Sequence, residues 1–405
     1  MDPTTGHQYQ NPSIKGLSKA VLVTGGAGYV GSHTCKLLAK NGFTPVTVDR
    51  HFREGLVSFG PNYNLTLPQE VNRLDEIITR YNITSCIHFA GSTSVPESVA
   101  DPSLYYKNNL IVTISLLDKL IECGVKTFVY SSSAATYGNP GLNKCKETDV
   151  CKPINSYGAT KLMMEQVCRD YKTAYDLSSV GLRYFNAAGA DPEGEVGELR
   201  ENETHIVPLA IDASRNNKTF KIFGDKYDTP DGTCVRDYVH VMDLADAHIK
   251  ALNYASYNKV AEVFNLGSGA PASNKELLDT VQKHTGKMNI EMHDNRPGDP
   301  AYLVADISKV KEILDKNQLV IEKIIKMWPD AMSSNLIQRK IDKVVLSNRI
   351  FNNKKERKKL EDIIHPLIEK ERRTFLQYFE NFDIVGLDVP LLYETGKDKE
   401  CDYVF

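Results

Sequence analysis

The segment AVLVTGGAGYVG at residues 20–31 decides the fold class of this 405-residue chain. Its first five residues are apolar or β-branched, as in a buried strand, and a helix-like stretch follows from Ser32 to Lys40. Between them, Gly25, Gly28 and Gly31 permit a tight turn and let backbone N–H groups approach a pyrophosphate at the start of the helix. Strand, glycine turn and helix together predict the beginning of a dinucleotide-binding unit.

The next predicted strand, Pro45 to Val48, ends at Asp49. A carboxylate at this position holds the adenosine ribose hydroxyls and excludes a 2'-phosphate, which predicts NAD as the cofactor. Arg50 follows directly and is an open point, since an arginine there favours a 2'-phosphate.

Strand-like and helix-like segments alternate along the first half of the chain. The predicted strands after Asp49 are Ser85–Phe89, Thr127–Tyr130 and Ser179–Leu182, and the predicted helices are Val71–Tyr81 and Tyr105–Cys123. Such alternation predicts an α/β fold with a doubly wound parallel sheet. Beyond RYFNAAGADP the pattern becomes irregular, with a helix at 204–214 and a strand at 219–223, which predicts a smaller substrate-binding lobe.

Tyr157 and Lys161 lie at the front of a helix-like run and are one turn apart, so the phenol and the ammonium should share one face. A neighbouring cation stabilises a phenolate and lowers its pKa, which predicts a proton shuttle. The serines at 131–133 follow a strand and supply a hydroxyl for the same substrate oxygen. Both features also have plain explanations, in chance spacing and in turn chemistry, and a second pair, Tyr393 and Lys397, is interpreted as accidental.

Composition sets broad limits on function. Hydrophobic content of 41%, charged content of 25% and a net charge of -3 are ordinary for a soluble globular protein and give no reason to expect nucleic acid or membrane partners. The polar residues 1–19 predict a disordered tail rather than a secretory signal. Eight scattered cysteines without a Cys-x-x-Cys pair predict a reduced, cytoplasmic protein, and no metal site is expected.

Residues 20–315 carry many familiar motifs, among them VLVTGGAGYVGSHT, IHFAG, YSSSAATYGNP, INSYGATKLMMEQ, LRYFNAAGADP, CVRDYVHVMDLADAH and RPGDPAYLVAD. Together they resemble the UDP-galactose 4-epimerases, a family of extended short-chain dehydrogenase/reductases. The resemblance implies a bound NAD that takes hydride from C4 of a UDP-hexose and returns it to the other face of a 4-keto intermediate. It also suggests a homodimer. The sequence leaves open which UDP-sugar pair is used.

The resemblance also implies individual roles. Tyr157 is the base, Lys161 its pKa modulator and nicotinamide-ribose anchor, and Ser133 the hydroxyl partner of the C4 oxygen. The implied cofactor contacts are Gly25, Gly28, Tyr29, Val30, Gly31, Asp49, Asn64, Phe89, Ala90, Gly91, Asn108, Tyr157, Lys161 and Phe185. The implied substrate contacts are Ser133, Asn186, His205, Ile206, Phe223, Arg236, Arg296 and Asp299.

Two comparisons within the superfamily refine this interpretation. Nucleotide-sugar dehydratases normally carry Asp-Glu after the strand-end hydroxyl residue, whereas Ala134 and Ala135 follow Ser133 here, so epimerisation is favoured. The family usually has a carboxylate at the adenine site where this chain has Asn64. Its loss weakens cofactor retention by about one hydrogen bond, ~0.5–1.5 kcal/mol. A catalytically silent NAD-binding chimera is therefore the alternative hypothesis.

The last ninety residues differ in character. EKIIKMWPDA, LEDIIHPLIEKERRTFL and VGLDVPLLYETGKDKECDYV resemble the middle of dephospho-CoA kinase, a P-loop kinase-like fold, and predict a mostly helical fragment at 316–405. The family's phosphate-binding pattern, Gly-x-x-x-x-Gly-Lys-Ser/Thr, occurs nowhere in the chain, so the fragment is expected to be inert. In the run NKKERKKLED at 353–362, acidic residues at helical spacing predict a solvated helix face rather than a nucleic-acid patch. The domains expected are therefore the tail, an NAD-binding domain at 20–190, a substrate lobe at 191–315 with strands that return to the core, and this fragment.

Overall fold

The computed structural model describes residues 20–51, 57–200, 203–296 and 299–314, together with a few positions between 327 and 359. The chain divides into two compact units, residues 1–311 and 312–405. The predicted tail and nearly all of the predicted fragment at 316–405 lie outside the described residues.

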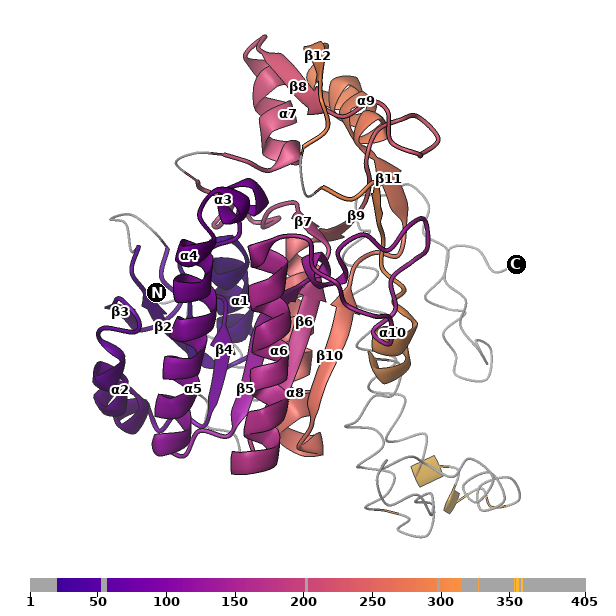
Figure 1. The fold of residues 1–405 in the computed structure, drawn as a ribbon. Helices are drawn as coiled ribbons and strands as arrows, with labels where there is room; N and C mark the ends of the chain where they lie inside the picture. Colours follow the sequence, from indigo (N-terminus) through magenta and orange to yellow (C-terminus); the bar gives the residue numbers. More distant parts are fainter. Residues whose placement is uncertain are drawn as a thin grey trace, which may run out of the picture. The chain divides into compact units, whose positions relative to one another are not determined.

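A seven-stranded parallel sheet forms the centre of the first unit (Figure 1). Its order is β10-β6-β5-β4-β1-β2-β3. The strands are β1 Ala20–Thr24, β2 Thr44–Asp49, β3 Asn62–Asn64, β4 Ser85–His88, β5 Thr127–Ser133, β6 Ser178–Tyr184 and β10 Ala261–Leu266. The order runs outward in both directions from β1, so the predicted doubly wound sheet is confirmed.

The serines close a strand as predicted, but that strand extends beyond its predicted bounds of Thr127–Tyr130. Ser131, Ser132 and Ser133 belong to β5 rather than following it, because their backbone continues to pair with Leu182, Arg183 and Tyr184 of β6. The serine side chains are thereby held on an ordered strand end instead of a turn.

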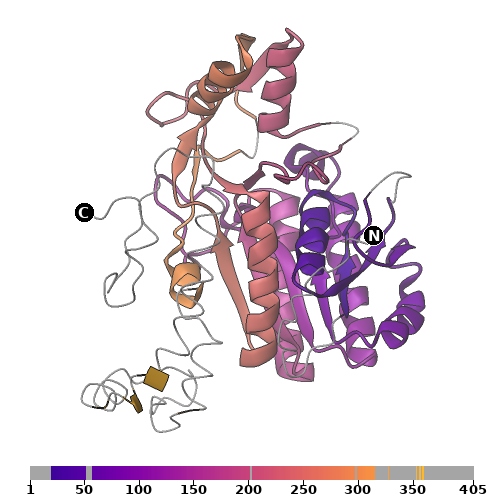
Figure 2. The same ribbon diagram turned by 180° about the vertical axis from the view of Figure 1, so that it is seen from behind.

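Helices cover both faces of the sheet. On one face α2 Leu74–Tyr81, α5 Val112–Glu122 and α6 Ser156–Tyr175 share a core with the strands. On the other face α1 Tyr29–Lys40 and α8 Val241–Asn258 pack side by side, as Figure 2 shows from behind. The predicted helix Tyr105–Cys123 is divided into α4 Pro102–Tyr105, a π-helical segment Tyr106–Ile111 and α5. Among the described residues no helix is both long and apolar enough to cross a membrane.

A smaller lobe lies beyond the carboxyl ends of the strands (Figure 1). It contains α7 Ile206–Arg215 and α9 Asn274–Thr285, with β8 Thr219–Phe223 paired in parallel to β12 Asn289–His293. A second small sheet joins β7 Asn186–Ala188, β9 Val235–His240, β11 Pro271–Ser273 and β13 Tyr302–Leu303. Two further α-helices of the described residues are α3 Val95–Ala100 and α10 Ser308–Leu314, and short 3₁₀ helices lie at Val71–Arg73 and Ala134–Tyr137.

A few residues of the second unit are described. Lys355, Glu356, Lys358 and Lys359 are helical, and the Asn353 side chain accepts hydrogen bonds from the backbone of Lys355 and Glu356. At these positions the predicted helix is confirmed.

Candidate functional site

The glycine turn brings three backbone segments into close contact. Gly25 has a φ of +73°, and a Cβ on it would lie 2.5 Å from the backbone nitrogen of Ala90. A Cβ on Gly31 would lie 2.3 Å from the carbonyl oxygen of Gly25. Helix α1 begins after Gly28 without a side-chain cap, so its first N–H groups face the turn and can bind an anion.

Asp49 lies at the end of β2, beside this turn. Its carboxylate accepts hydrogen bonds from the backbone nitrogens of Ala27 and His51, each at 3.0 Å. The glycine turn therefore fixes the carboxylate at the edge of the sheet, in the position that the sequence predicts for a ribose contact.

Asn64 is not among the residues that line the cavity described below. It is the last residue of β3, opposite Asp49, and its side chain is exposed. When its amide nitrogen donates, the acceptors are the backbone oxygens of Asp49 and Arg50. Asn62 and Leu65 line the cavity at this end, and the adenine-site role of Asn64 stays a prediction.

Tyr157 and Lys161 lie on the first turns of α6, as their spacing predicts. Asn155 caps the start of the helix, and its side chain accepts a hydrogen bond from the Gly158 nitrogen at 2.8 Å. The Lys161 Nζ donates to the Ser131 carbonyl at 2.8 Å and to the Ser131 hydroxyl at 3.1 Å. It lies 6.0 Å from the centre of the Tyr157 ring. The structure thus brings the predicted base, cation and serine strand end together.

The two ionisable groups respond to burial in opposite directions. Burial raises the pKa of the Tyr157 phenol, against a hydrogen bond from Ser133 and the positive charge of Arg200, which lower it. Burial lowers the pKa of Lys161 to about 8. Burial is the largest influence on the pKa of the phenol, and the Lys161 ammonium is bonded to Ser131. The lowering of the Tyr157 pKa by Lys161 stays a prediction.

One cavity of about 1760 Å³ joins the two halves of the predicted site. Such a volume exceeds the usual range for one ligand and has room for a dinucleotide beside a nucleotide sugar. Every predicted site residue except Asn64 lines it: Gly25, Gly28, Tyr29, Val30 and Gly31 on the glycine turn, Asp49, Phe89, Ala90, Gly91 and Asn108 near the strand ends, Ser133, Tyr157, Lys161 and Phe185 in the middle, and Asn186, His205, Ile206, Phe223, Arg236, Arg296 and Asp299 towards the lobe.

The lobe end of the cavity carries two fixed arginines. Arg236 on β9 donates to the Pro300 carbonyl at 2.8 Å and forms an ion pair with Asp299 at 2.6 Å. The Arg296 guanidinium lies 3.8 Å from the centre of the Phe223 ring. Guanidinium groups held in this way present positive charge to an anionic ligand with little further loss of side-chain freedom.

Sequence analysis missed several residues of the cavity wall. Tyr184 lies at the end of β6, and its hydroxyl is hydrogen bonded to the buried His248. Arg200 donates to Glu198 at 2.7 Å, and the same carboxylate lies 2.7 Å from the His205 imidazole. Tyr184 directly precedes Phe185, a predicted cofactor contact, in the motif LRYFNAAGADP, so this motif could have indicated it. Arg200 is an isolated arginine in a loop and gives no sequence signal.

Acidic side chains gather at two places where spacing predicted nothing. Glu198, Glu203 and His205 form one group, and Asp191, Glu193 and Glu195 form the other. In the second group the buried Lys36 ammonium contacts all three carboxylates at 2.5–2.7 Å. The Lys36 ammonium therefore occupies the place among these carboxylates and offsets part of their charge. We assign no metal to either group.

Comparison with known proteins gives two family matches. The NAD dependent epimerase/dehydratase family matches residues 21–267, and the dephospho-CoA kinase family matches residues 301–405. The UDP-glucose 4-epimerase of Rhizobium meliloti (strain 1021) is 46% identical over 298 residues, which cover 73% of this chain and 90% of that protein. The UDP-glucose 4-epimerase of Halalkalibacterium halodurans is 42% identical over 299 residues, 73% of this chain and 89% of that protein.

Solved structures agree with these matches. The crystal structure of UDP-glucose 4-epimerase from Brucella ovis in complex with NAD has a TM-score of 0.70 at 42% identity and covers 73% of this chain and 92% of its own. That of the Bifidobacterium longum enzyme in complex with NAD+ and UDP has a TM-score of 0.68 at 36% identity, with the same two coverages. The epimerase family match, residues 21–267, lies within the unit that holds the cavity.

We expect Lys161→Met to raise the free energy of unfolding near pH 7 by about 1–2 kcal/mol. Unfolding restores the lysine pKa from about 8 to 10.5, so the wild-type protein gains stability as pH rises between these values. The advantage of the variant should be complete below pH 8 and shrink between pH 8 and 10.5. Urea unfolding at pH 7, 8.5 and 10 measures it.

Lys36→Met is the matched control, since this buried lysine is paired with carboxylates that raise its pKa. It should lower stability at pH 7. A Lys161→Met protein less stable than wild type at pH 7, or one whose advantage does not change with pH, would contradict the assignment.

Proposed function

Because the chain belongs to the NAD dependent epimerase/dehydratase family, we propose that it catalyses epimerisation at C4 of a UDP-hexose, UDP-galactose to UDP-glucose, with bound NAD. The observation that carries this proposal is the single cavity in which Tyr157, Lys161 and Ser133 lie between the glycine turn and the two arginines. A cofactor and a nucleotide sugar that enter from opposite ends would meet at these three residues.

The residues of the glycine turn fit the cofactor. A Cβ at Gly25 or Gly31 would clash with neighbouring backbone atoms of the turn, so only glycine leaves room at these positions. The start of α1 has no side-chain cap, and its free N–H groups suit a pyrophosphate. Asp49 favours NAD over its 2'-phosphorylated form. Arg50 is exposed and donates to His51 at 3.0 Å. When bound, NAD accepts a hydride from the sugar and gives it back, so no net redox change follows.

The chain's own residues handle the proton and the substrate. Tyr157 takes the proton of the C4 hydroxyl as the sugar is oxidised and returns it when the carbonyl is reduced. Ser133 donates a hydrogen bond to the same oxygen, and Lys161 holds the nearby ribose. Arg236 and Arg296 neutralise the diphosphate, so the sugar is anchored by its nucleotide while both faces of C4 stay reachable.

The remaining assignments are proposals too. We place the NAD-binding domain at 20–190 and the substrate lobe at 191–315, with β10 returning to the main sheet. The cysteines of the described residues are all free, which supports a reducing, cytoplasmic location. Fractionation of cells that express the chain would test the location.

Tyr157→Phe is expected to lower kcat about 10²- to 10⁴-fold, because the variant keeps the ring and loses the proton acceptor. The assay follows conversion of UDP-galactose to UDP-glucose by the purified full chain without added cofactor, together with release of bound nucleotide. Tyr175→Phe, at the exposed end of the same helix, is the control and should retain activity.

Two outcomes would count against this assignment. Retained activity in Tyr157→Phe would remove the tyrosine from its role. A wild-type chain without nucleotide and without activity would overturn the proposed function and favour the catalytically silent alternative.

Dephospho-CoA kinase activity is the second candidate, favoured only by the match at 301–405. We expect no coenzyme A to form from ATP and dephospho-CoA with the purified chain, because its sequence holds no Gly-x-x-x-x-Gly-Lys-Ser/Thr loop for the ATP phosphates. Formation of coenzyme A above the background of an enzyme-free sample would overturn this expectation.

We also propose a homodimer. Ile111 and Met163 are 48% and 42% exposed and lie on neighbouring elements, the π-helical segment and α6. A second copy would cover both side chains. Ile111→Asp with Met163→Asp should convert the dimer to a monomer in sedimentation equilibrium, while Lys250→Asp, at an exposed position of α8 on the other face of the sheet, should not. A wild-type chain that sediments as a monomer would rule out the dimer.

A further inference from the structure

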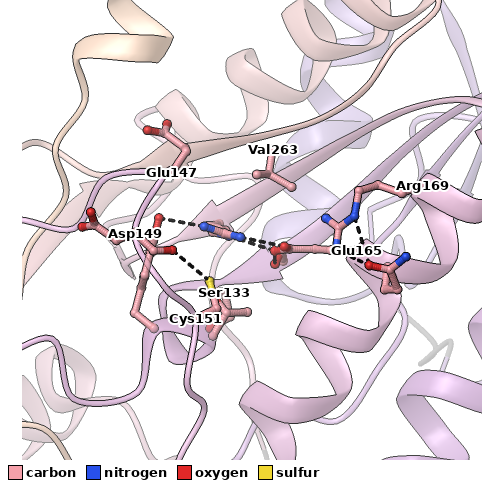
Figure 3. Close-up of polar contacts among 12 residues, drawn as sticks. Ser133, Glu147, Asp149, Cys151, Glu165, Arg169 and Val263 are labelled. Carbon is pink, nitrogen blue, oxygen red and sulfur yellow. Dashed lines mark hydrogen bonds and ion pairs between the residues drawn. The ribbon is translucent and has the colours of Figure 1, made fainter.

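Helix α6 presents a third polar residue to the sheet behind the proposed catalytic pair. Tyr157, Lys161 and Glu165 follow one another at intervals of one helical turn and so share one face. Glu165 is only 1% exposed, and the mechanism does not use it. Figure 3 shows its carboxylate held by polar contacts.

Two strands bind this carboxylate. Arg183 on β6 donates from Nε to one carboxylate oxygen at 2.9 Å and from Nη2 to the other at 2.7 Å. Ser132 on β5 donates to the first oxygen at 2.6 Å. Both partners are almost completely buried. A bidentate pair of this kind fixes distance and orientation together.

The arginine is held from its other side as well. Its Nη1 donates to the Tyr137 hydroxyl at 2.9 Å, and this hydroxyl donates to the Asn265 side chain at 2.7 Å. Tyr137 ends the short 3₁₀ turn that begins directly after Ser133. The network therefore contacts the catalytic helix, the serine strand and the turn beyond it.

Apolar packing alone leaves the position of α6 along β5 weakly specified, because hydrophobic contact is not directional. The three serines each contact a different residue of α6: Ser131 bonds to Lys161, Ser132 to Glu165, and Ser133 to Tyr157. Of these contacts only the one at Glu165 is locked by a bidentate ion pair. The contacts at Lys161 and Tyr157 involve side chains that must be able to change partners when a substrate binds.

We propose that Glu165 and Arg183 are positioning residues, whose buried ion pair fixes α6 against β5 so that Tyr157 and Lys161 face Ser133 and Ser131. This inference rests on the proposed epimerase function. A buried ion pair is often replaceable by neutral side chains without loss of stability, which separates positioning from stability in an experiment.

The experiment compares full-length wild type with Glu165→Gln, Arg183→Met and the double variant. Each single variant leaves a buried partner unpaired and should melt at a lower temperature. The double variant removes both charges and should recover most of the wild-type Tm. Its kcat should nevertheless stay about 10- to 100-fold low, with KM within about twofold, because a small displacement of the base slows the chemical step more than binding.

Lys119→Met on α5 is the control, since it removes a buried ammonium that is paired with two exposed carboxylates, Asp75 on α2 and Glu122 on α5, and none of the three residues lines the cavity. It should lower Tm without changing kcat. A double variant with both wild-type Tm and wild-type kcat would overturn the proposal, since stability and activity would then have recovered together.

A second readout does not depend on activity. Competitive acetylation followed by mass spectrometry measures the apparent pKa of Lys161, which is expected near 8 in the wild type and should rise in the double variant as the helix shifts. If the wild-type chain proves inactive, the proposed function fails, but the labelling of Lys161 still tests whether Glu165 and Arg183 position α6. An unchanged Lys161 pKa in a folded double variant overturns the positioning role, and a raised one supports it.

Discussion

The reversal of strand order beside β1 is the constraint on which the site depends. Chain segments leave β1 towards β2 on one side and β4 on the other, so the space above β1 is left open for a ligand. The segments that border this space approach so closely that a side chain at Gly25 would meet the backbone of Ala90. Glycine there is a steric requirement of the fold as well as a feature of the proposed cofactor site.

Electrostatics in the cavity follow from burial. Low solvent access disfavours the charged form of both Tyr157 and Lys161, raising one pKa and lowering the other. Ser133 and Arg200 oppose this effect at the phenol. Two groups that spacing did not indicate therefore support a phenolate: Ser133 at the strand end and Arg200 in a loop of the proposed substrate lobe.

Backbone hydrogen bonding between strands, rather than the start of the kinase family match, shows where the first unit ends. The kinase family match begins at residue 301, yet Tyr302 and Leu303 form β13 beside β9, and Leu303 lines the cavity. Ala305 also donates its backbone N–H to Asp237 at 3.1 Å. These residues act as part of the first unit, since their backbone groups find partners there and the compact unit extends to Lys311.

The sequence by itself determined the features that depend on local chain geometry: the apolar run of β1, the glycines of the turn, and the helical spacing of Tyr157 and Lys161. Only the tertiary structure decided which distant groups meet them. It directed Lys161 to Ser131, paired Glu165 with Arg183, brought Arg200 to the cavity and left Asn64 outside it. The physical reason is that periodicity fixes the face on which a side chain lies, whereas long-range packing fixes its partner and its solvation, and these set its pKa.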